Sequence, residues 1–515
     1  MAYERPGVYV QEGLFSTNVN PATGPTVAAF VGLAERGPIA PTLVTSWNQY
    51  KSLFGDLNST YDLGYAVYHY FANGGQSAYV TRVADATAVK ASGGVLGTPT
   101  GGSAAPLFSM TAKSPGTWGN DLVVDLTFQE ETVVDATTAP KIDLDTLFTL
   151  TVKLDGTEVE NWYGLSFNPA NTRYVSSVLD LYSSYVESAS VAVIASGTEL
   201  TVSGVTVGDL VANISFTTGS EGSGSIDSTD WASALTSHET IASGLLFNLV
   251  GQTSSTIINN AITVMQTRGN SFLIIDPPLT ATTKAALESA VASYTQSGYA
   301  AVYGPALKMY DPKKTGAAAI RDTYPGGAVA GAYVRSEVTR GVAKAPAGYA
   351  LDLRNVYGLV ATLTEAEQGS LYKNQQINMF INVPGVGVVI NGARTQARNT
   401  IEKYVTVRRS LNYLKDLLKQ KTLFAMFESN DERLWAEISV RVSAFLNTFW
   451  STGGLKGKTS GEAFYIICDS TNNTPTDVEN GVVNIEVGVS LQTPAEFIVI
   501  NISQWTGGTT VTTTA

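Results

Sequence analysis

The pattern of apolar and polar positions divides the chain into three unlike stretches. In the first 90 residues, and again after residue 240, continuous apolar runs such as residues 27–33 and 272–275 alternate with segments of helical periodicity. Continuous apolar runs are typical of strands buried on both faces, and their alternation with helices predicts a parallel α/β sheet. Residues 89–235 instead carry short alternating runs rich in Thr and Val, which predicts β-structure.

The α/β pattern predicts a definite series of elements. Ser46 is placed to cap a helix that Gly55 ends. The expected strands lie at residues 27–33, 77–83, 244–251, 272–275 and 299–304. The expected helices lie at residues 46–54, 62–72, 254–267, 280–297 and 328–338.

The last third has a different pattern. Two long amphipathic helices are expected at residues 394–419 and 432–450, because apolar side chains recur there at helical spacing. Three strands are expected after them, at residues 464–468, 482–491 and 496–502.

These patterns predict an α/β multi-domain protein. Its α/β core domain carries a β-rich insertion, and an N-terminal strand arm completes an α+β C-terminal domain. Two low-complexity stretches, residues 91–105 and 217–229, have the composition of flexible linkers that bracket the insertion. The expected parts are an arm (1–22), a middle domain (23–88 plus 236–350), an outer insertion (89–235), a C-terminal domain (351–505) and a disordered tail (506–515).

Composition and charge narrow the class of protein. Of 515 residues, 44% are hydrophobic and only 15% are charged, against about a quarter in an average soluble protein. A protein surface with so few charges is either rich in small polar residues or buried against partners. The net charge of −12 argues against nucleic acid as a direct partner. Residues 89–240 hold 18 acidic and 5 basic residues, whereas residues 391–458 hold 12 basic and 6 acidic ones, so the two parts are expected to face different surroundings.

Residues suited to catalysis or metal binding are few. The chain has two isolated histidines, His69 and His238, and one cysteine, Cys468, in an apolar run typical of a buried strand. They form no catalytic triad and no zinc-ligand pattern. Asp276, followed by two prolines at the end of an expected parallel strand, is the best enzyme candidate and supports a hydrolase only as a minor alternative. The sequence therefore predicts no catalytic, cofactor or metal site.

The N-terminus lacks the basic and apolar regions of a signal peptide, and no apolar run approaches membrane-spanning length. We therefore expect synthesis and folding in a cytoplasm, without direct membrane contact. A set of basic residues on the first long helix is compatible with three surroundings: solvent, DNA or an acidic protein partner. Its members are Arg408, Arg409, Lys415, Lys419 and Lys421.

Several segments together resemble the contractile phage tail sheath family. They occur in the family's order at both ends and in the middle of the chain. Ala343 and Ser429 replace the Trp and Pro that the family often has at these places. The segments are residues 6–10, 29–38, 44–47, 53–55, 71–75, 78–83, 114–120, 327–331, 340–348, 408–409, 427–431, 434–435 and 494–500.

The resemblance implies a structural subunit rather than an enzyme, without cofactors. Copies of the chain would stack as a helix of rings around an inner tail tube, with baseplate and tail terminator proteins as further partners. The expected location is the virion tail, assembled in the host bacterial cytoplasm. A tailocin or an extracellular contractile injection system remains the alternative; a surface-layer protein or adhesin would need an export signal.

The resemblance also implies which residues join the subunits. Short apolar strands at both ends can pair with sheet edges of neighbouring copies. The residues expected to exchange are Gly7, Val8, Tyr9, Val10, Glu496, Phe497, Ile498, Val499 and Ile500. The basic helix residues Arg408, Arg409, Lys415, Lys419 and Lys421 are expected to face an acidic tube, and the acidic insertion is expected to face solvent.

Overall fold

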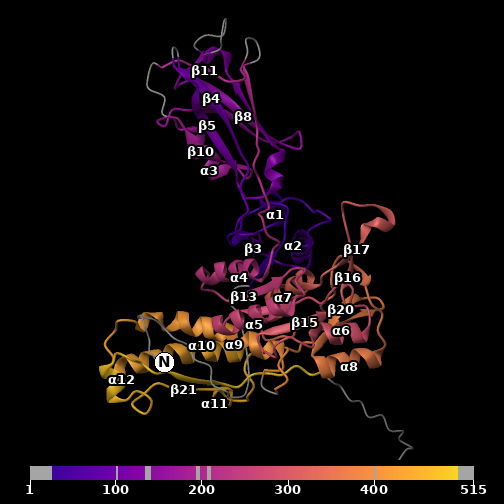
Figure 1. The fold of residues 1–515 in the computed structure, drawn as a ribbon. Coiled ribbons are helices and arrows are strands. Elements are labelled where there is room, and N and C mark those ends of the chain that lie inside the picture. The colour runs from indigo at the N-terminus through magenta and orange to yellow at the C-terminus, as the bar shows by residue number, and fades with distance from the viewer. Residues whose placement is uncertain are drawn as a thin grey trace, which may run out of the picture.

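The computed structural model of the chain describes residues 26–99, 102–133, 141–192, 198–205, 210–399 and 402–496. The molecule is elongated, with a β-rich lobe at one end, an α/β layer in the middle and a pair of long helices at the other end (Figure 1). The predicted fold class is confirmed for the described residues, whereas the N-terminal arm and the tail lie outside them.

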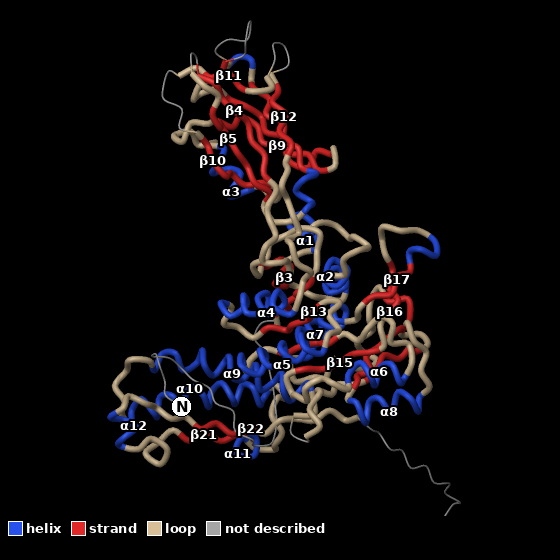
Figure 2. The backbone as a smooth tube through the Cα atoms, in the orientation of Figure 1, coloured by secondary structure: helices blue, strands red, loops and turns tan. Residues whose placement is uncertain are grey.

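The middle of the molecule is an eight-stranded sheet (Figure 2). Its six inner strands run parallel, and an antiparallel strand closes each edge. In the register, Ala28 lies opposite Leu246 on one neighbouring strand and Ala78 on the other. The strands, in spatial order, are β2 (Thr42–Val44), β3 (Ala78–Arg82), β1 (Val27–Gly32), β13 (Leu245–Leu249), β14 (Phe272–Ile275), β15 (Ala300–Gly304), β19 (Ile377–Val383) and β20 (Gly387–Asn391).

Helices cover both faces of this sheet. Alternate residues of β1 enter separate cores: Phe30 packs with the helices of one face and Val31 with those of the other. The first face carries α1 (Trp47–Phe54), α2 (Leu63–Ala72) and α7 (Gly326–Arg340). The second face carries α4 (Ser228–Thr236), α5 (Ser255–Arg268), α6 (Lys284–Val291) and α8 (Glu365–Gln375).

Two glycines bring α7 against the backbone of α2. A Cβ on Gly327 would lie 2.1 Å from the carbonyl oxygen of Ala66, and one on Gly331 would lie 2.6 Å from that of Tyr70. Because the two glycines are four residues apart, they share one face of α7. The small-residue segment 327–331 therefore sets the distance between these helices.

Two predicted domain boundaries need correction. β19 and β20 fall after the expected boundary at residue 350, yet they complete the middle sheet. Helix α4 was expected inside the insertion, but its Trp231 packs into the core beneath the sheet. In both cases the long-range strand pairing or packing that decides membership is not visible in local periodicity.

The insertion is a compact β-lobe with a single core. It combines two sheets and one short helix, α3 (Val175–Tyr182). The first sheet contains β10 (Val186–Val191), β5 (Ala105–Ala112), β4 (Ser92–Pro99), β11 (Leu200–Val202) and β7 (Lys141–Ile142). The second contains β12 (Val211–Ser215), β6 (Leu122–Phe128), β8 (Leu147–Leu154) and β9 (Thr157–Ser166).

The first expected linker is instead strand β4. A Cβ on Gly93 would lie 2.8 Å from the ring of Phe216, and one on Gly94 would lie 3.0 Å from the carbonyl oxygen of Phe108. The glycines of this stretch therefore allow close packing, and their composition was wrongly interpreted as flexibility.

A narrow neck joins the insertion to the sheet. Val89 and Ser220 form an antiparallel bridge there, so the chain leaves and returns side by side. Arg82, which is buried, donates to the carbonyl oxygens of Ala34 (2.9 Å) and Pro115 (2.5 Å) and to the carboxylate of Glu221 (2.9 Å). One guanidinium thus connects the middle sheet to both sides of the neck.

The remaining elements form a small sheet beside the middle layer and a separate C-terminal region with two long helices and a two-stranded sheet. The small sheet contains β17 (Ile320–Thr323), β16 (Leu307–Tyr310) and β18 (Val356–Leu359). The C-terminal region contains α9 (Val405–Thr422), α10 (Glu432–Ser451), α11 (Ser460–Ala463), β21 (Phe464–Ile467), α12 (Pro475–Glu479) and β22 (Glu486–Val489).

The first long helix begins eleven residues later than expected. Arg394 was expected to open it, but its N–H donates to the side chain of Asn378 at 2.7 Å and its guanidinium binds Glu496. The helix starts at Val405. Tertiary hydrogen bonds thus hold Arg394 outside the helix, although arginine itself favours helices.

Candidate assembly interfaces

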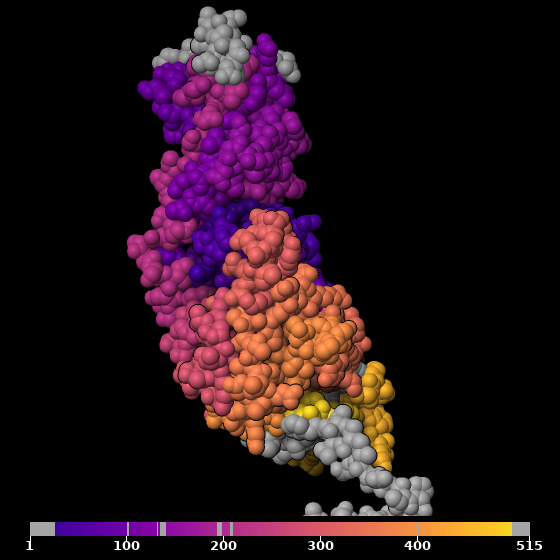
Figure 3. Space-filling model, turned by 90° about the vertical axis from the view of Figure 1, so that its right-hand side faces the viewer, coloured from indigo at the N-terminus to yellow at the C-terminus, as the bar shows by residue number. Residues whose placement is uncertain are grey.

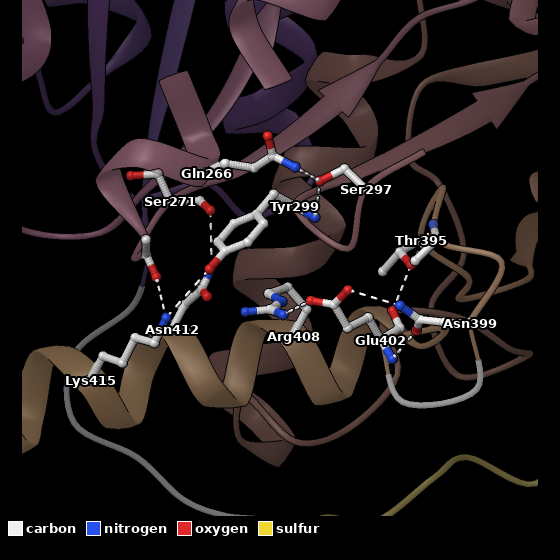
Figure 4. Close-up of polar contacts among 12 residues, drawn as sticks. Gln266, Ser271, Ser297, Tyr299, Thr395, Asn399, Glu402, Arg408, Asn412 and Lys415 are labelled. Carbon is white, nitrogen blue, oxygen red and sulfur yellow. Dashed lines mark hydrogen bonds and ion pairs between the residues drawn. The ribbon is translucent and has the colours of Figure 1, made fainter. Parts of the chain in front are cut away.

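Helix α9 crosses the starting edge of the parallel sheet and contacts the residue that precedes each of three strands. The guanidinium of Arg408 lies 4.2 Å from the ring centroid of Tyr299, before β15. Asn412 donates to the carbonyl oxygen of Ser271, before β14, at 2.9 Å. Asp416 accepts from the N–H of Gly244, before β13, at 2.7 Å. Figure 4 shows the first two of these contacts, with Lys415 beside them.

The spacing of this ladder follows from helix and sheet geometry. Residues 408, 412 and 416 are four apart, a rise of about 6 Å each along a helix. Parallel strands lie about 4.8 Å apart. One turn of α9 therefore meets one strand, and consecutive turns meet consecutive strands in the order β15, β14, β13.

Two arginines of the predicted basic face lie inside the molecule. Arg408 is 1% exposed and forms an ion pair with Glu402. Arg409 is 5% exposed; it donates to Glu337 of α7 at 2.5 Å and to the hydroxyl of Thr26 at 2.9 Å. The prediction that these two arginines lie on an exposed, tube-facing surface is therefore wrong for this structure, because acidic partners within the chain hold them.

The three lysines of that face differ in exposure. Lys415 is half-buried, and its ammonium group donates to the carbonyl oxygen of Gly269 at 3.2 Å. Lys419 and Lys421, in the last turns of α9, are exposed. The positive surface that α9 offers to a partner is therefore centred on Lys419 and Lys421.

The root of the expected C-terminal exchange strand is also held by an ion pair. Arg394 makes two hydrogen bonds to the carboxylate of Glu496, at 2.8 and 2.6 Å. Tyr372 donates to the same carboxylate at 2.5 Å. Burial would raise the pKa of Glu496, but the hydrogen bonds from Arg394 and Tyr372 lower that pKa below its usual value. The side chain of Glu496, which was expected to exchange, is thus bound within its own chain, while residues 7–10 and 497–500 lie outside the described residues.

The structure describes no strand beside either edge of the two-stranded sheet of the C-terminal region. Among the described residues, β21 and β22 pair only with each other. One face of this sheet packs on α10 through side chains such as Ile466 and Val487, which stay half-buried. Two strands alone are marginally stable, so such a sheet is suited to accept further strands.

The enzyme candidates are occupied by structural contacts. Asp276 is 1% exposed; its two carboxylate oxygens accept hydrogen bonds from the N–H of Gly326 (2.7 Å) and the amide of Asn248 (2.8 Å). Burial raises its pKa to about 7. This carboxyl caps the start of α7, so the main support for a hydrolase is removed.

The remaining reactive groups are buried as well. Burial lowers the pKa of His69 to about 3 and that of His238 to about 4. Burial raises the pKa of Cys468 to about 11, as expected of a thiol in a core. Within the described ranges, no group of three acidic, His or Cys side chains is arranged to hold a metal ion, and no helix is long and apolar enough to cross a membrane.

Comparisons with known proteins agree on one class. Residues 398–504 match the model of the phage tail sheath C-terminal domain. The tail sheath protein of Vibrio phage KVP40 is 26% identical over 159 residues, which are 30% of this chain and 22% of that protein. The tail sheath protein of Enterobacteria phage T4 is 24% identical over 248 residues, 44% of this chain and 36% of that protein. These matches span well under half the length of the curated relatives.

The fold extends the similarity to nearly the whole chain. The sheath complex of an extracellular contractile injection system, PVC, in its contracted state has a TM-score of 0.55 at 20% identity, covering 98% of both chains. The contracted helical sheath of the anti-feeding prophage has a TM-score of 0.54 at 18% identity, covering 98% of this chain and 100% of that one. The sheath tail protein Lin1278 of Listeria innocua has a TM-score of 0.59 at 11% identity, covering 92% and 96%. The predicted resemblance to contractile tail sheath proteins is thereby confirmed in sequence and in fold.

Sequence reasoning missed the partners of the basic segment. Glu337 and Thr26 are separated from Arg409 by 72 and 383 residues, and Glu496 is 102 residues from Arg394. Nothing in the local pattern pairs them.

Proposed function

We propose that this chain is the subunit of a contractile tail sheath, which polymerises around an inner tail tube and contracts to drive the tube through the host cell envelope. The observation that carries the proposal is the sheath fold across almost the whole chain, together with the sequence match of residues 398–504. In this role the chain hydrolyses no nucleotide, and the energy for contraction is stored in the assembled lattice.

Copies of the chain are joined by strand addition to the sheet of β21 and β22. Gly7, Val8, Tyr9 and Val10 of one copy, and Phe497, Ile498, Val499 and Ile500 of another, supply the added strands. The sheet edges without a described neighbouring strand and the half-buried core of the C-terminal region support this assignment. Backbone hydrogen bonds between added strands hold copies together while the rest of each subunit reorients.

The further partners follow from the same role. The inner tube contacts the exposed end of α9, where Lys419 and Lys421 meet an acidic surface. Baseplate and tail terminator proteins close the two ends of the polymer. The particle is a virion tail, and it assembles in the cytoplasm of the host bacterium.

Electron microscopy of the purified full chain, alone and mixed with its tube protein, tests the proposal. We expect long hollow striated tubes in at least one condition, and monomers or short rings after deletion of residues 1–20. The double reversal Lys419→Glu with Lys421→Glu should weaken assembly on the tube but leave the subunit folded. A wild-type chain that stays monomeric at all concentrations, with and without the tube, would contradict the proposal.

A sheath of an extracellular injection system or tailocin is a second candidate, because solved injection-system sheaths cover 98% of this chain. The contents of particles purified from the producing cells separate the two. Particles attached to a DNA-filled capsid indicate a phage, whereas particles without nucleic acid indicate an injection device.

A further inference from the structure

Both segments predicted to exchange between subunits emerge from buried clamps that join an arginine to a glutamate. Thr26 lies 16 residues after Val10, and Glu496 directly precedes Phe497. The strand-exchange proposal assigns no role to these two roots. Their contacts join segments far apart in the sequence, and each is built around a buried arginine.

The N-terminal root is held by three hydrogen bonds. The backbone N–H of Thr26 donates to one carboxylate oxygen of Glu337 at 3.2 Å, and its hydroxyl donates to the other at 2.7 Å. Arg409 donates to the same hydroxyl at 2.9 Å and to Glu337 at 2.5 Å. Glu337 and Arg409 are 8% and 5% exposed. Thr26 is therefore fixed to α7 of the middle layer and to α9 of the C-terminal region at once.

The C-terminal root is held in a similar way. Both oxygens of Glu496 bind the guanidinium of Arg394, and Tyr372 of α8 donates to one of them. The ammonium group of Lys403 lies 3.8 Å from the same carboxylate. The guanidinium of Arg394 also lies 4.0 Å from the ring centroid of Tyr372. Glu496 is therefore fixed to α8 and to the segment that leads into α9.

The two clamps share one segment of chain. Arg394 lies in the connection between β20 and α9, and Arg409 lies in the second turn of α9. Arg408, directly before Arg409, binds Glu402 and stacks over Tyr299, which fixes the same segment to the start of β15. A force applied to either root is thus transmitted to the sheet edge that α9 crosses, and not to a single strand.

A strand that pairs with another subunit transmits any relative movement to its root. When a strand is pulled from one end, its backbone hydrogen bonds break one at a time. A root without an anchor would therefore detach step by step from its own subunit. Charge-assisted hydrogen bonds in a buried site are stronger than neutral ones and resist this. We propose that the Thr26–Glu337–Arg409 and Arg394–Glu496–Tyr372 clamps anchor the two exchange arms, fixing where each arm leaves the subunit and carrying tension into α9. This inference rests on the proposed sheath function.

Substitutions that spare the fold test the anchors separately. Thr26→Val removes the hydroxyl but keeps the shape and leaves the Glu337–Arg409 ion pair intact, whereas Thr26→Ser keeps the hydroxyl. Glu496→Gln weakens the second clamp. Glu437→Gln is the matched control, because it removes a similar charge from an exposed ion pair on α10. The readouts are the pelleted fraction and length of tubes, and the thermal unfolding of the unassembled chain.

We expect Thr26→Val and Glu496→Gln to reduce assembled tubes about tenfold, because each loses roughly two of the hydrogen bonds that hold an arm root in its own subunit. Thr26→Ser and Glu437→Gln should assemble like the wild type. Unassembled Thr26→Val should unfold at nearly the wild-type temperature, because the root can open locally without global unfolding. A purely stabilising role would instead lower the unfolding temperature and assembly together.

Several outcomes overturn the anchors without affecting the sheath proposal. One is wild-type assembly by both Thr26→Val and Glu496→Gln while deletion of residues 1–20 abolishes tubes. Another is loss of assembly by Thr26→Ser to the same extent as by Thr26→Val. Failure of the wild-type chain itself to form tubes, with its tube protein present, overturns the sheath proposal instead.

Discussion

The insertion and the C-terminal region lie at opposite ends of the molecule and differ in how complete they are (Figure 1). The core of the insertion contains 26 buried hydrophobic residues with 11 half-buried ones around it. The core of the C-terminal region contains 13 buried and 15 half-buried ones. These counts cover the described residues of each cluster. The insertion forms its core from its own residues, whereas many apolar side chains of the C-terminal region remain partly exposed.

The difference in closure suggests a division of labour. The insertion has a closed core and joins the middle sheet through the narrow neck. It therefore adds little to contacts between subunits, and its sequence is free to vary. A region with an open two-stranded sheet needs further strands to complete its core. The side view shows the insertion projecting away from the middle layer, with the C-terminal region at the far end (Figure 3). Assembly is therefore expected to depend on the C-terminal end and to tolerate changes in the insertion.

Separate expression of the two regions is expected to give the largest contrast. Residues 84–225 should unfold in one cooperative transition, with a stability of about 5–10 kcal/mol, because their core is closed. Residues 392–496 should show no cooperative transition, because about half of the apolar residues of their core stay half-buried. Denaturant unfolding followed by circular dichroism measures both.

A core variant checks that the isolated insertion keeps the same structure. Phe148, which is fully buried, should cost about 3–5 kcal/mol when replaced by Ala in the fragment. A cooperative transition in the isolated C-terminal fragment would remove the contrast on which the division of labour depends.

Arg408→Met tests the buried arginine of the α9 ladder. It breaks a largely buried ion pair with Glu402 and a cation–π contact with Tyr299, so we expect a loss of about 2–4 kcal/mol in the free energy of unfolding. The matched variant Lys421→Met removes the same charge from an exposed site and should change stability by less than about 0.5 kcal/mol. Equal effects would mean that Arg408 is as exposed as Lys421.

Asp276→Asn tests the middle sheet to which both regions are attached. The pKa of Asp276 is raised from 3.8 to about 7, so its folded state favours the protonated carboxyl. The stabilisation from proton binding is complete below the unfolded pKa and is lost as pH rises through about 7. The stability of the wild type relative to Asp276→Asn should therefore fall by on the order of 2–4 kcal/mol between pH 4 and pH 8. Urea unfolding across this range measures the difference, and a constant difference would show that the carboxyl keeps its usual pKa.

The smallest expected contrast concerns loop conformation. Phe427, between α9 and α10, is 87% exposed and has φ +65°, a conformation that disfavours large side chains. Gly156, in the β8–β9 turn of the insertion, has φ +74° and is a residue suited to it. Phe427→Gly should stabilise the chain by about 1 kcal/mol, whereas Gly156→Ala should destabilise it by about 1 kcal/mol. Thermal unfolding of both variants tests the signs, and a destabilised Phe427→Gly would show that the aromatic ring makes a compensating contact.

The residue sequence by itself determined the α/β layer, because strands buried on both faces and helices with one apolar face leave strong periodic patterns. It also determined the resemblance to sheath proteins through the order of its segments. Tertiary structure alone decided that the glycine-rich stretch of β4 is a strand and that α9 begins at Val405. It alone decided which arginines are buried, because the partners of Arg394 and Arg409 lie 72 to 383 residues away and burial of a charge depends on a partner that local sequence does not name.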